Sequence, residues 1–264
     1  LHISDMHFSP GDKKYLDELE ALLKNIEEPI DLITLGGDFV NDDEGIAWVP
    51  EFLRRLPEGV PKLAVLGNHD FYQMSIHGYW LLMLAMTVWR GTRPLDTPRL
   101  RKVLEEGGVR LFEDAGARMD LSAGPLYVYG MRQPFLRQPH RPPSGRPPPV
   151  EPGCFHLLLV HRPDIPPEYA EGYHLVLGGH THGGQIAPPG LGALRTNCRI
   201  HPATAAGHYR IGSAQWIVNN GFSSDVHTRV RWNRPRQISL IEVRPGITPS
   251  VLPQLRFCRP PQEP

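Results

Sequence analysis

The chain has 264 residues, enough for one large domain with a substantial apolar core. Its 28 basic and 28 acidic side chains cancel, so no overall charge attracts nucleic acid or an anionic membrane. The three cysteines are far apart and form no C-x-x-C pair, which argues against a disulfide framework and a zinc–thiolate cluster. We expect a single domain over residues 1–264.

Five short apolar runs have the length of strands and lack polar alternation. Strands buried on both faces have this composition. The runs are LHIS (1–4), DLITLGG (31–37), KLAVLG (62–67), FHLLLV (155–160) and YHLVLGG (173–179).

Helical patterns separate several of these runs. Residues 13–26 place apolar side chains on one stripe, and a second helix is predicted from Thr97 as N-cap, with Pro98 in its first turn and a closing glycine. Strands alternating with helices indicate an α/β core. The later runs 125–131, 215–221 and 236–243 predict further strands; no long helix separates the last two, which suggests an antiparallel portion.

Two segments interrupt this pattern. An apolar stretch in HGYWLLMLAMTVWRG (77–91) predicts a hydrophobic insertion at about residues 72–93, either a buried helix or a lid beside the site that meets acyl chains or a membrane interface. A proline-rich stretch, 137–153, predicts an exposed loop, with a ligand for a recognition module as the alternative.

The sequence contains neither a signal peptide nor a run of about 18 apolar residues. Because LHIS reads as the end of a strand, we expect that a preceding segment has been removed. Cytoplasmic and peripheral-membrane locations both stay open.

Each of the five buried runs is followed by side chains that bind metals. Ligands in open α/β sheets bind at the carboxyl ends of strands, so these side chains should converge. Carboxylate, imidazole and amide groups suit Mn, Fe, Co or Zn, and their number exceeds what one ion needs. Two ions about 3.5–4 Å apart would clamp a phosphoryl group and generate hydroxide, with Asp38 as the bridging carboxylate. The residues are Asp5, His7, Asp38, Asn68, His69, Asp70, His161, His180 and His182.

These motifs resemble those of the calcineurin-like metallophosphoesterase superfamily: Asp5-x-His7, Gly37-Asp38, Gly67-Asn68-His69-Asp70, His161 and Gly179-His180-x-His182. The extended GGHTHGGQI and the late segment VNNGFSSDVHTRVRWNRPRQISLIEV further resemble a bacterial membrane-associated branch. The resemblance implies a four-layered α/β/β/α sandwich of two mixed sheets flanked by helices.

The resemblance also implies roles for these residues. Asp5, His7, Asp38 and His182 would hold one metal, while Asp38, Asn68, His161 and His180 would hold a second. His69 would face the substrate and assist the leaving group, and Asp70 would orient His69. The second motif departs from the usual G-D-x-x-D, because Asn41 replaces the last acid; we expect altered orientation and metal affinity.

The implied activity is hydrolysis of a phosphoric ester or anhydride by a metal-bridging hydroxide, with two divalent ions (Mn, Fe, Zn or Co) as cofactors. The substrate would be a phosphoester or pyrophosphate. In one form of this hypothesis the substrate is a lipid-linked envelope compound, and the protein makes peripheral contact with the membrane. A protein or nucleotide phosphatase and a non-catalytic metal-binding scaffold are the alternatives. Arg229 and Arg231 fit either an anion contact or a solvated face. The sequence has no basic stripe with interleaved aromatic residues, so it does not indicate a nucleic-acid substrate or partner.

Overall fold

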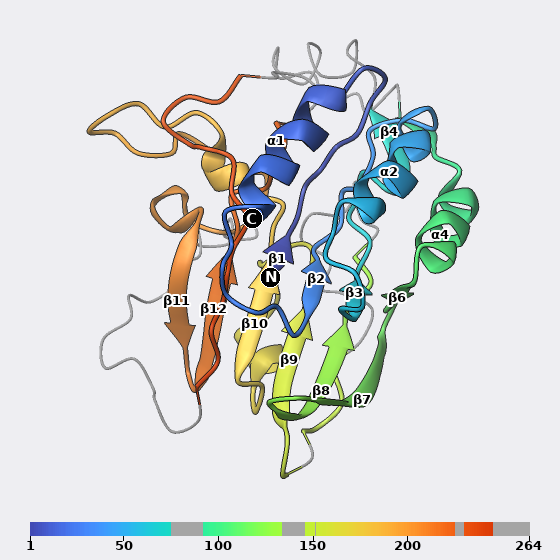
Figure 1. The fold of residues 1–264 in the computed structure, drawn as a ribbon. Coiled ribbons are helices and arrows are strands. Elements are labelled where there is room, and N and C mark those ends of the chain that lie inside the picture. Colours follow the sequence, from blue (N-terminus) through green and yellow to red (C-terminus); the bar gives the residue numbers. More distant parts are fainter. Residues whose placement is uncertain (75–91, 134–145, 151, 225–229, 245–264) are drawn as a thin grey trace.

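The computed structural model describes residues 1–74, 92–133, 146–150, 152–224 and 230–244 (Figure 1). Its strands form a four-stranded sheet, a six-stranded sheet and a two-stranded ribbon. The predicted hydrophobic segment 77–91 lies outside the described residues, as does part of the proline-rich loop. The described residues 146–150 of that loop form neither helix nor strand.

The first sheet contains the strands of the amino-terminal half. It is parallel throughout, and an isolated antiparallel bridge between His2 and Ser239 extends its edge. In spatial order its strands are β1 (His2–Ile3), β2 (Ile33–Leu35), β3 (Lys62–Ala64) and β6 (Val109–Leu111).

The second sheet combines parallel and antiparallel pairing. β9, β10 and β12 run parallel, whereas β7 and β11 pair antiparallel with β8 and β12 at the two edges. In spatial order its strands are β11 (Gly207–Ile211), β12 (Ala214–Val218), β10 (Leu175–Gly178), β9 (Phe155–Leu159), β8 (Gly124–Gly130) and β7 (Ala115–Leu121). The ribbon pairs β4 (Tyr72–Met74) with β5 (Thr92–Pro94).

Helices cover the outer face of the first sheet (Figure 1). They are α1 (Lys13–Leu23), the 3-10 helix η1 (Gly45–Trp48), α2 (Val49–Arg54) and α4 (Thr97–Glu106). α1 buries Leu16 and Leu19 against the sheet but leaves Leu22 exposed. The predicted N-cap of α4 was wrong by one residue: the Asp96 side chain accepts from the Arg99 backbone N–H at 3.1 Å, whereas Thr97 donates to the Asp70 carbonyl.

Three apolar clusters define the layers. One joins the helices to the first sheet, and another lies between the sheets, where Leu63 and Val65 meet Leu157 and Leu177. The third lies on the outer face of the second sheet, around Trp216. Among the described residues, that face is covered by irregular segments and the 3-10 helix η2 (Pro167–Ala170).

The predicted fold is confirmed: this is an α/β structure of two packed sheets, and all five predicted strands that precede metal-binding side chains are present. The predicted strand over 236–243 is wrong apart from the bridge at Ser239. β1 has only two residues, which leaves this segment too little edge to pair with. None of the helices in the described ranges has the length and apolarity that crossing a bilayer requires.

Candidate metal centre

The carboxyl ends of five strands lead to one buried cluster of polar side chains. β1, β2 and β3 belong to the first sheet, and β9 and β10 belong to the second. The cluster brings together all seven predicted ligands, none of which is more than 8% exposed: Asp5, His7, Asp38, Asn68, His161, His180 and His182. The site therefore spans both sheets.

One half of the cluster consists of Asp5, His7 and His182, whose ligand atoms lie close enough to share an ion. The Nε2 atoms of His7 and His182 are 3.1 Å apart, and His182 Nε2 is 3.8 Å from Asp5 Oδ1. The His180 backbone N–H donates to both oxygens of Asp5, at 3.0 and 3.1 Å. The loop after β10 is thereby fixed to the loop after β1.

The other half consists of Asp38, His161 and His180, which form a second set able to hold an ion. His161 Nε2 is 3.1 Å from His180 Nδ1 and 3.2 Å from Asn68 Oδ1. The amide oxygen of Asn68 thus faces the same point as the two imidazoles. This half has the composition that the resemblance implied.

Asp38 lies between the two halves. Its Oδ2 is 3.1 Å from His161 Nε2 and 3.6 Å from His7 Nε2, while Oδ1 accepts from the His69 backbone N–H at 2.8 Å. Burial alone would raise the pKa of Asp38, but the surrounding imidazoles, His161 foremost, hold it well below its usual range. The same carboxylate outweighs burial and raises the pKa of His161 to about 9.

Three imidazoles are oriented by acceptors behind them. His161 Nδ1 donates to the Gly36 carbonyl at 2.8 Å, and His182 Nδ1 lies 3.3 Å from the Ser223 carbonyl. His7 Nδ1 lies 2.8 Å from Asn41 Oδ1. A proton on Nδ1 leaves the Nε2 lone pair directed into the cluster, which is the arrangement that ligated histidines use.

Asn41 occupies the position where the family motif usually has an acid. Its Nδ2 donates to the His7 carbonyl at 2.7 Å, which fixes the orientation of the amide. Oδ1 must then accept from His7 Nδ1–H. The amide therefore orients His7 without a negative charge. A carboxylate at this position would set an oxygen against the His7 carbonyl.

The backbone of the cluster is left-handed at five of the seven predicted ligands. The φ angles are 56° at Asp5, 49° at His7, 54° at Asp38, 66° at His180 and 50° at His182. Residues other than glycine seldom adopt this conformation, and each costs about 1–2 kcal/mol. The surrounding hydrogen bonds hold these turns in place.

Two glycines permit the close approach of these loops. A Cβ at Gly67 would lie 2.1 Å from Asp38 Oδ1, and a Cβ at Gly179 would lie 2.3 Å from Asp5 Oδ2. Either methyl group would displace a carboxylate from the cluster. Gly179, the second glycine of the GGHTHGGQ run, is thus required by the proximity of Asp5.

Gly179→Ala is expected to weaken metal binding by about tenfold or more, because it moves the Asp5 carboxylate that the site needs. Isothermal titration with Mn²⁺ measures the change. Gly178→Ala is the matched control, since its Cβ would meet nothing nearer than Pro163 Cβ at 3.1 Å. Equal affinities in the two variants would contradict the assigned role of Gly179.

His69 and Asp70 are both buried beside Asp38, and the Asp70 carboxylate binds backbone N–H groups rather than the His69 ring. Asp70 accepts from the backbone N–H groups of Gly67, Asp38, Phe39 and Val40. Within the described part of the chain its carboxylate makes no hydrogen bond to the His69 ring, whose buried Nδ1 is unpaired. Asp70 instead ties the loop after β2 to the loop after β3. Burial and the charge of Asp38 raise the pKa of Asp70 to about 7.

Sequence reasoning did not assign the loop after β12, which touches the cluster through backbone atoms. The Ser223 N–H donates to the Asp5 carbonyl at 2.8 Å, and the Ser223 carbonyl faces His182. Arg231 directs its guanidinium at backbone carbonyls of this loop. Neither sequence interpretation of Arg231 anticipated this contact. Arg229 lies outside the described residues. The only sequence signal was the late segment beginning VNNG.

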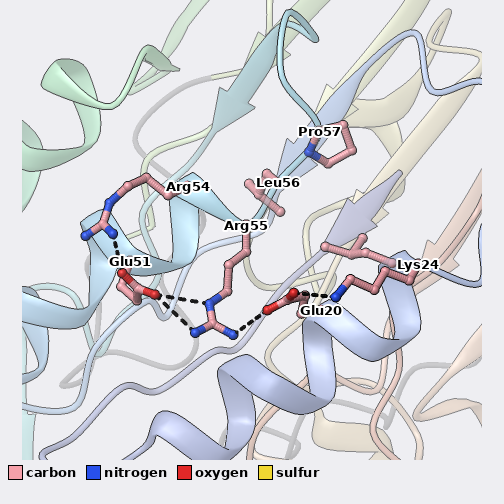
Figure 2. A pocket seen from close by; sticks show the side chains of 8 residues that line it. Glu20, Lys24, Glu51, Arg54, Arg55, Leu56 and Pro57 are labelled. Atoms are coloured by element: carbon pink, nitrogen blue, oxygen red, sulfur yellow. Dashed lines mark hydrogen bonds and ion pairs between the residues drawn. The ribbon is translucent and has the colours of Figure 1, made fainter.

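A charged groove between α1 and α2 contains none of the predicted ligands (Figure 2). Arg55 lies at its centre and pairs with Glu20 at 2.8 Å and Glu51 at 3.1 Å, while Lys24 pairs with Glu20 at 2.6 Å. The charged side chains of the groove are thus paired with one another, Arg54 with Glu51 included. The buried cluster is the stronger candidate site.

The chain is similar to proteins of one known family. Residues 1–184 match the family described as calcineurin-like phosphoesterase. The uncharacterized metallophosphoesterase YkoQ of Bacillus subtilis is 30% identical over 193 residues, which cover 72% of this chain and 62% of the relative. Phosphodiesterase YaeI of Escherichia coli is 27% identical, covering 73% and 63%. This chain therefore spans less than two thirds of the length of either relative.

Among solved structures, the chain is similar to the phosphopantetheinyl hydrolase of Mycobacterium tuberculosis. It is 13% identical with a TM-score of 0.47, over 86% of this chain and 89% of that chain. The family match covers more than half of the present sequence and includes all seven predicted ligands. The protein belongs to the calcineurin-like phosphoesterase family.

Proposed function

We propose that this protein is a dinuclear metal-dependent phosphoesterase that hydrolyses a phosphoric ester or anhydride. The observation that carries the proposal is the position of Asp38, whose carboxylate belongs to the set with His161 and His180 and also lies 3.6 Å from His7 of the set with Asp5 and His182. A bridging carboxylate in such a place is what a two-ion centre needs.

The donor set fits divalent transition metals. The cluster offers two carboxylates, four imidazoles and one amide oxygen, a combination that suits Mn, Fe, Co or Zn. Imidazole nitrogens 3.1 Å apart, as in the pairs His7–His182 and His161–His180, face common points. When bound, two ions would supply Lewis acidity to the phosphoryl oxygens and lower the pKa of water for attack on phosphorus.

The residues of the chain have separate tasks in this proposal. Asp5, His7 and His182 would hold one ion, and Asn68, His161 and His180 would hold the other, with Asp38 shared. His69 would stabilise charge on the phosphoryl group or donate a proton to the leaving oxygen. Its ring packs edge-on against that of His7, with centroids 4.7 Å apart, which supports a place at the rim of the centre. Asp70 would act indirectly, by joining the loops that carry Asp38 and His69.

The substrate class rests on the proposed chemistry and on the relatives. The name of the E. coli relative makes a phosphodiester the first substrate to test. A lipid-linked substrate and peripheral membrane contact remain an extension of this proposal, because the apolar segment 77–91 that suggested them lies outside the described residues.

Metal content tests the proposal directly. Purified protein reconstituted with Mn²⁺ is expected to contain two ions per chain by elemental analysis, because Asp5, His7 and His182 form one set able to hold an ion and Asp38, His161 and His180 form another. Chelation is expected to abolish hydrolysis of an aryl phosphodiester while leaving far-ultraviolet circular dichroism unchanged. Undiminished activity in chelator, or no bound ion after reconstitution, would contradict the proposal.

A substrate panel separates the alternatives. Aryl phosphodiesters, nucleotide-sugar pyrophosphates, lipid phosphates, cyclic nucleotides and a phosphopeptide would be compared with the same reconstituted protein. A preference for the phosphopeptide or the nucleotides would support the protein or nucleotide phosphatase. Two bound ions without turnover of any member would support the scaffold instead.

A further inference from the structure

The loop after β12, residues 219–224, lies directly behind one half of the proposed centre. Phe222 N–H donates to the Ser4 carbonyl at 2.9 Å, and Ser223 N–H donates to the Asp5 carbonyl at 2.8 Å. The Ser223 carbonyl lies 3.3 Å from His182 Nδ1. This short loop therefore contacts two of the three residues Asp5, His7 and His182. It lies beyond the region matched to the family, which ends at residue 184.

Arg231 holds this loop through its backbone. Nη2 donates to the carbonyls of Asn220 at 2.7 Å and Gly221 at 3.2 Å, and Ser223 receives hydrogen bonds from both Nε, at 3.1 Å, and Nη2. Nη1 donates to the carbonyls of Arg234 and Pro235, each at 3.3 Å. One guanidinium thus joins the loop to the segment that follows it.

We propose that Arg231 is a positioning residue for the half of the centre formed by Asp5, His7 and His182. By holding the Ser223 carbonyl, it provides the acceptor for His182 Nδ1–H, which leaves the Nε2 lone pair available to an ion. Hydrogen-bond partners of this kind orient ligating histidines, and their loss weakens metal binding by about 10–100-fold. The inference rests on the proposed two-ion centre.

A second contact of Arg231 acts in the opposite direction. Nη2 lies 3.2 Å from His182 Nδ1, and a guanidinium can only donate, so this contact favours the tautomer with its proton on Nε2. That proton can be donated to His7 Nε2 at 3.1 Å, because Asn41 keeps the His7 proton on Nδ1. Ligation of His182 through Nε2 requires the other tautomer, for which the Ser223 carbonyl is the acceptor. If the Arg231 variants bind metal more weakly than the wild type, the contact with the Ser223 carbonyl dominates. If they bind it more tightly, the direct contact with His182 Nδ1 dominates.

The test is Mn²⁺ titration by calorimetry of the chelator-treated full chain. The wild type is expected to bind two ions with resolvable affinities. Arg231→Met is expected to weaken one of them by about 10–100-fold and leave the other unchanged. Arg231→Lys retains the charge with fewer, differently placed donors, so we expect an intermediate effect on the same ion. The lysine variant also provides the measurement if the methionine variant does not fold.

Arg236→Gln is the matched control. It removes the same charge from the same segment, but the contacts of Arg236 are an ion pair with Glu18 and a cation–π contact with Tyr15 rather than hydrogen bonds to the loop. We expect both ion affinities to remain at the wild-type values even if its melting temperature falls. If the wild type binds two ions and the Arg231 variants bind them equally or more tightly, the role of Arg231 is overturned but the proposed function is not. A wild type that binds fewer than two ions would overturn the proposed function and this inference with it.

Discussion

Asp38→Asn is expected to lower phosphoesterase activity by about three or more powers of ten and to remove at least one bound ion. The substitution takes a negative charge from between four buried imidazoles, and the Lewis-acid contribution lost with the ions amounts to several kcal/mol. In addition, the pKa of His161 would fall, because the Asp38 carboxylate is what raises it. Metal content and turnover of an aryl phosphodiester should be measured on the same preparation.

Asp43→Asn provides the control for this experiment. It makes the same chemical change nearby in the chain, but Asp43 forms a surface pair with Arg93. Metal content and rate should stay at wild-type levels. An Asp38→Asn protein that retained two ions and normal turnover would remove Asp38 from its bridging role.

His69→Asn is expected to separate chemistry from metal binding. Turnover should fall by about two or more powers of ten, the scale of a lost general acid or charge-stabilising donor, while both ions remain bound. The ions should remain because His69 is not among the seven proposed ligands, and because the substitution preserves the backbone N–H that donates to Asp38. Single-turnover rates and elemental analysis together measure the two effects.

The control is His208→Asn, a change at an exposed histidine that bonds Gln215 on the second sheet. It should affect neither rate nor metal content. Loss of the ions in the His69 variant would show that this histidine belongs to the metal-binding set, whereas full activity would exclude it from the reaction.

The sequence predicted the parts of the site that depend on strand ends. Apolar runs identify buried strands, and metal-binding residue types follow them, so the seven candidate ligands could be named before the structure placed them in one buried cluster. The candidate ligands that follow β1, β2 and β3 lie at the same edge of the first sheet because these three strands run parallel. Ligands from the second sheet join them because the two sheets pack face to face.

The parts that sequence patterns could not predict depend on contacts with backbone atoms. Asp70 was assigned to His69 by its position in the motif, but its carboxylate binds four backbone N–H groups. The contact between Ser223 and His182 joins residues 41 positions apart through a carbonyl, which has no residue-specific signal. The segment 236–243 has the composition of a strand, but only Ser239 pairs with β1.

The left-handed backbone at five of the proposed ligands has a consequence for how this protein would change over generations. Each such residue costs about 1–2 kcal/mol, a substantial fraction of the 5–15 kcal/mol that typically stabilises a domain. Glycine adopts the same conformation without this steric cost. Glycine at His7 or Asp38 would relieve this steric cost but would also remove the hydrogen bond to Asn41 or to the His69 backbone N–H, so lineages released from selection for the reaction could exchange them with little net penalty. If distant descendants still carry these two side chains, selection has continued to act on the function of the site.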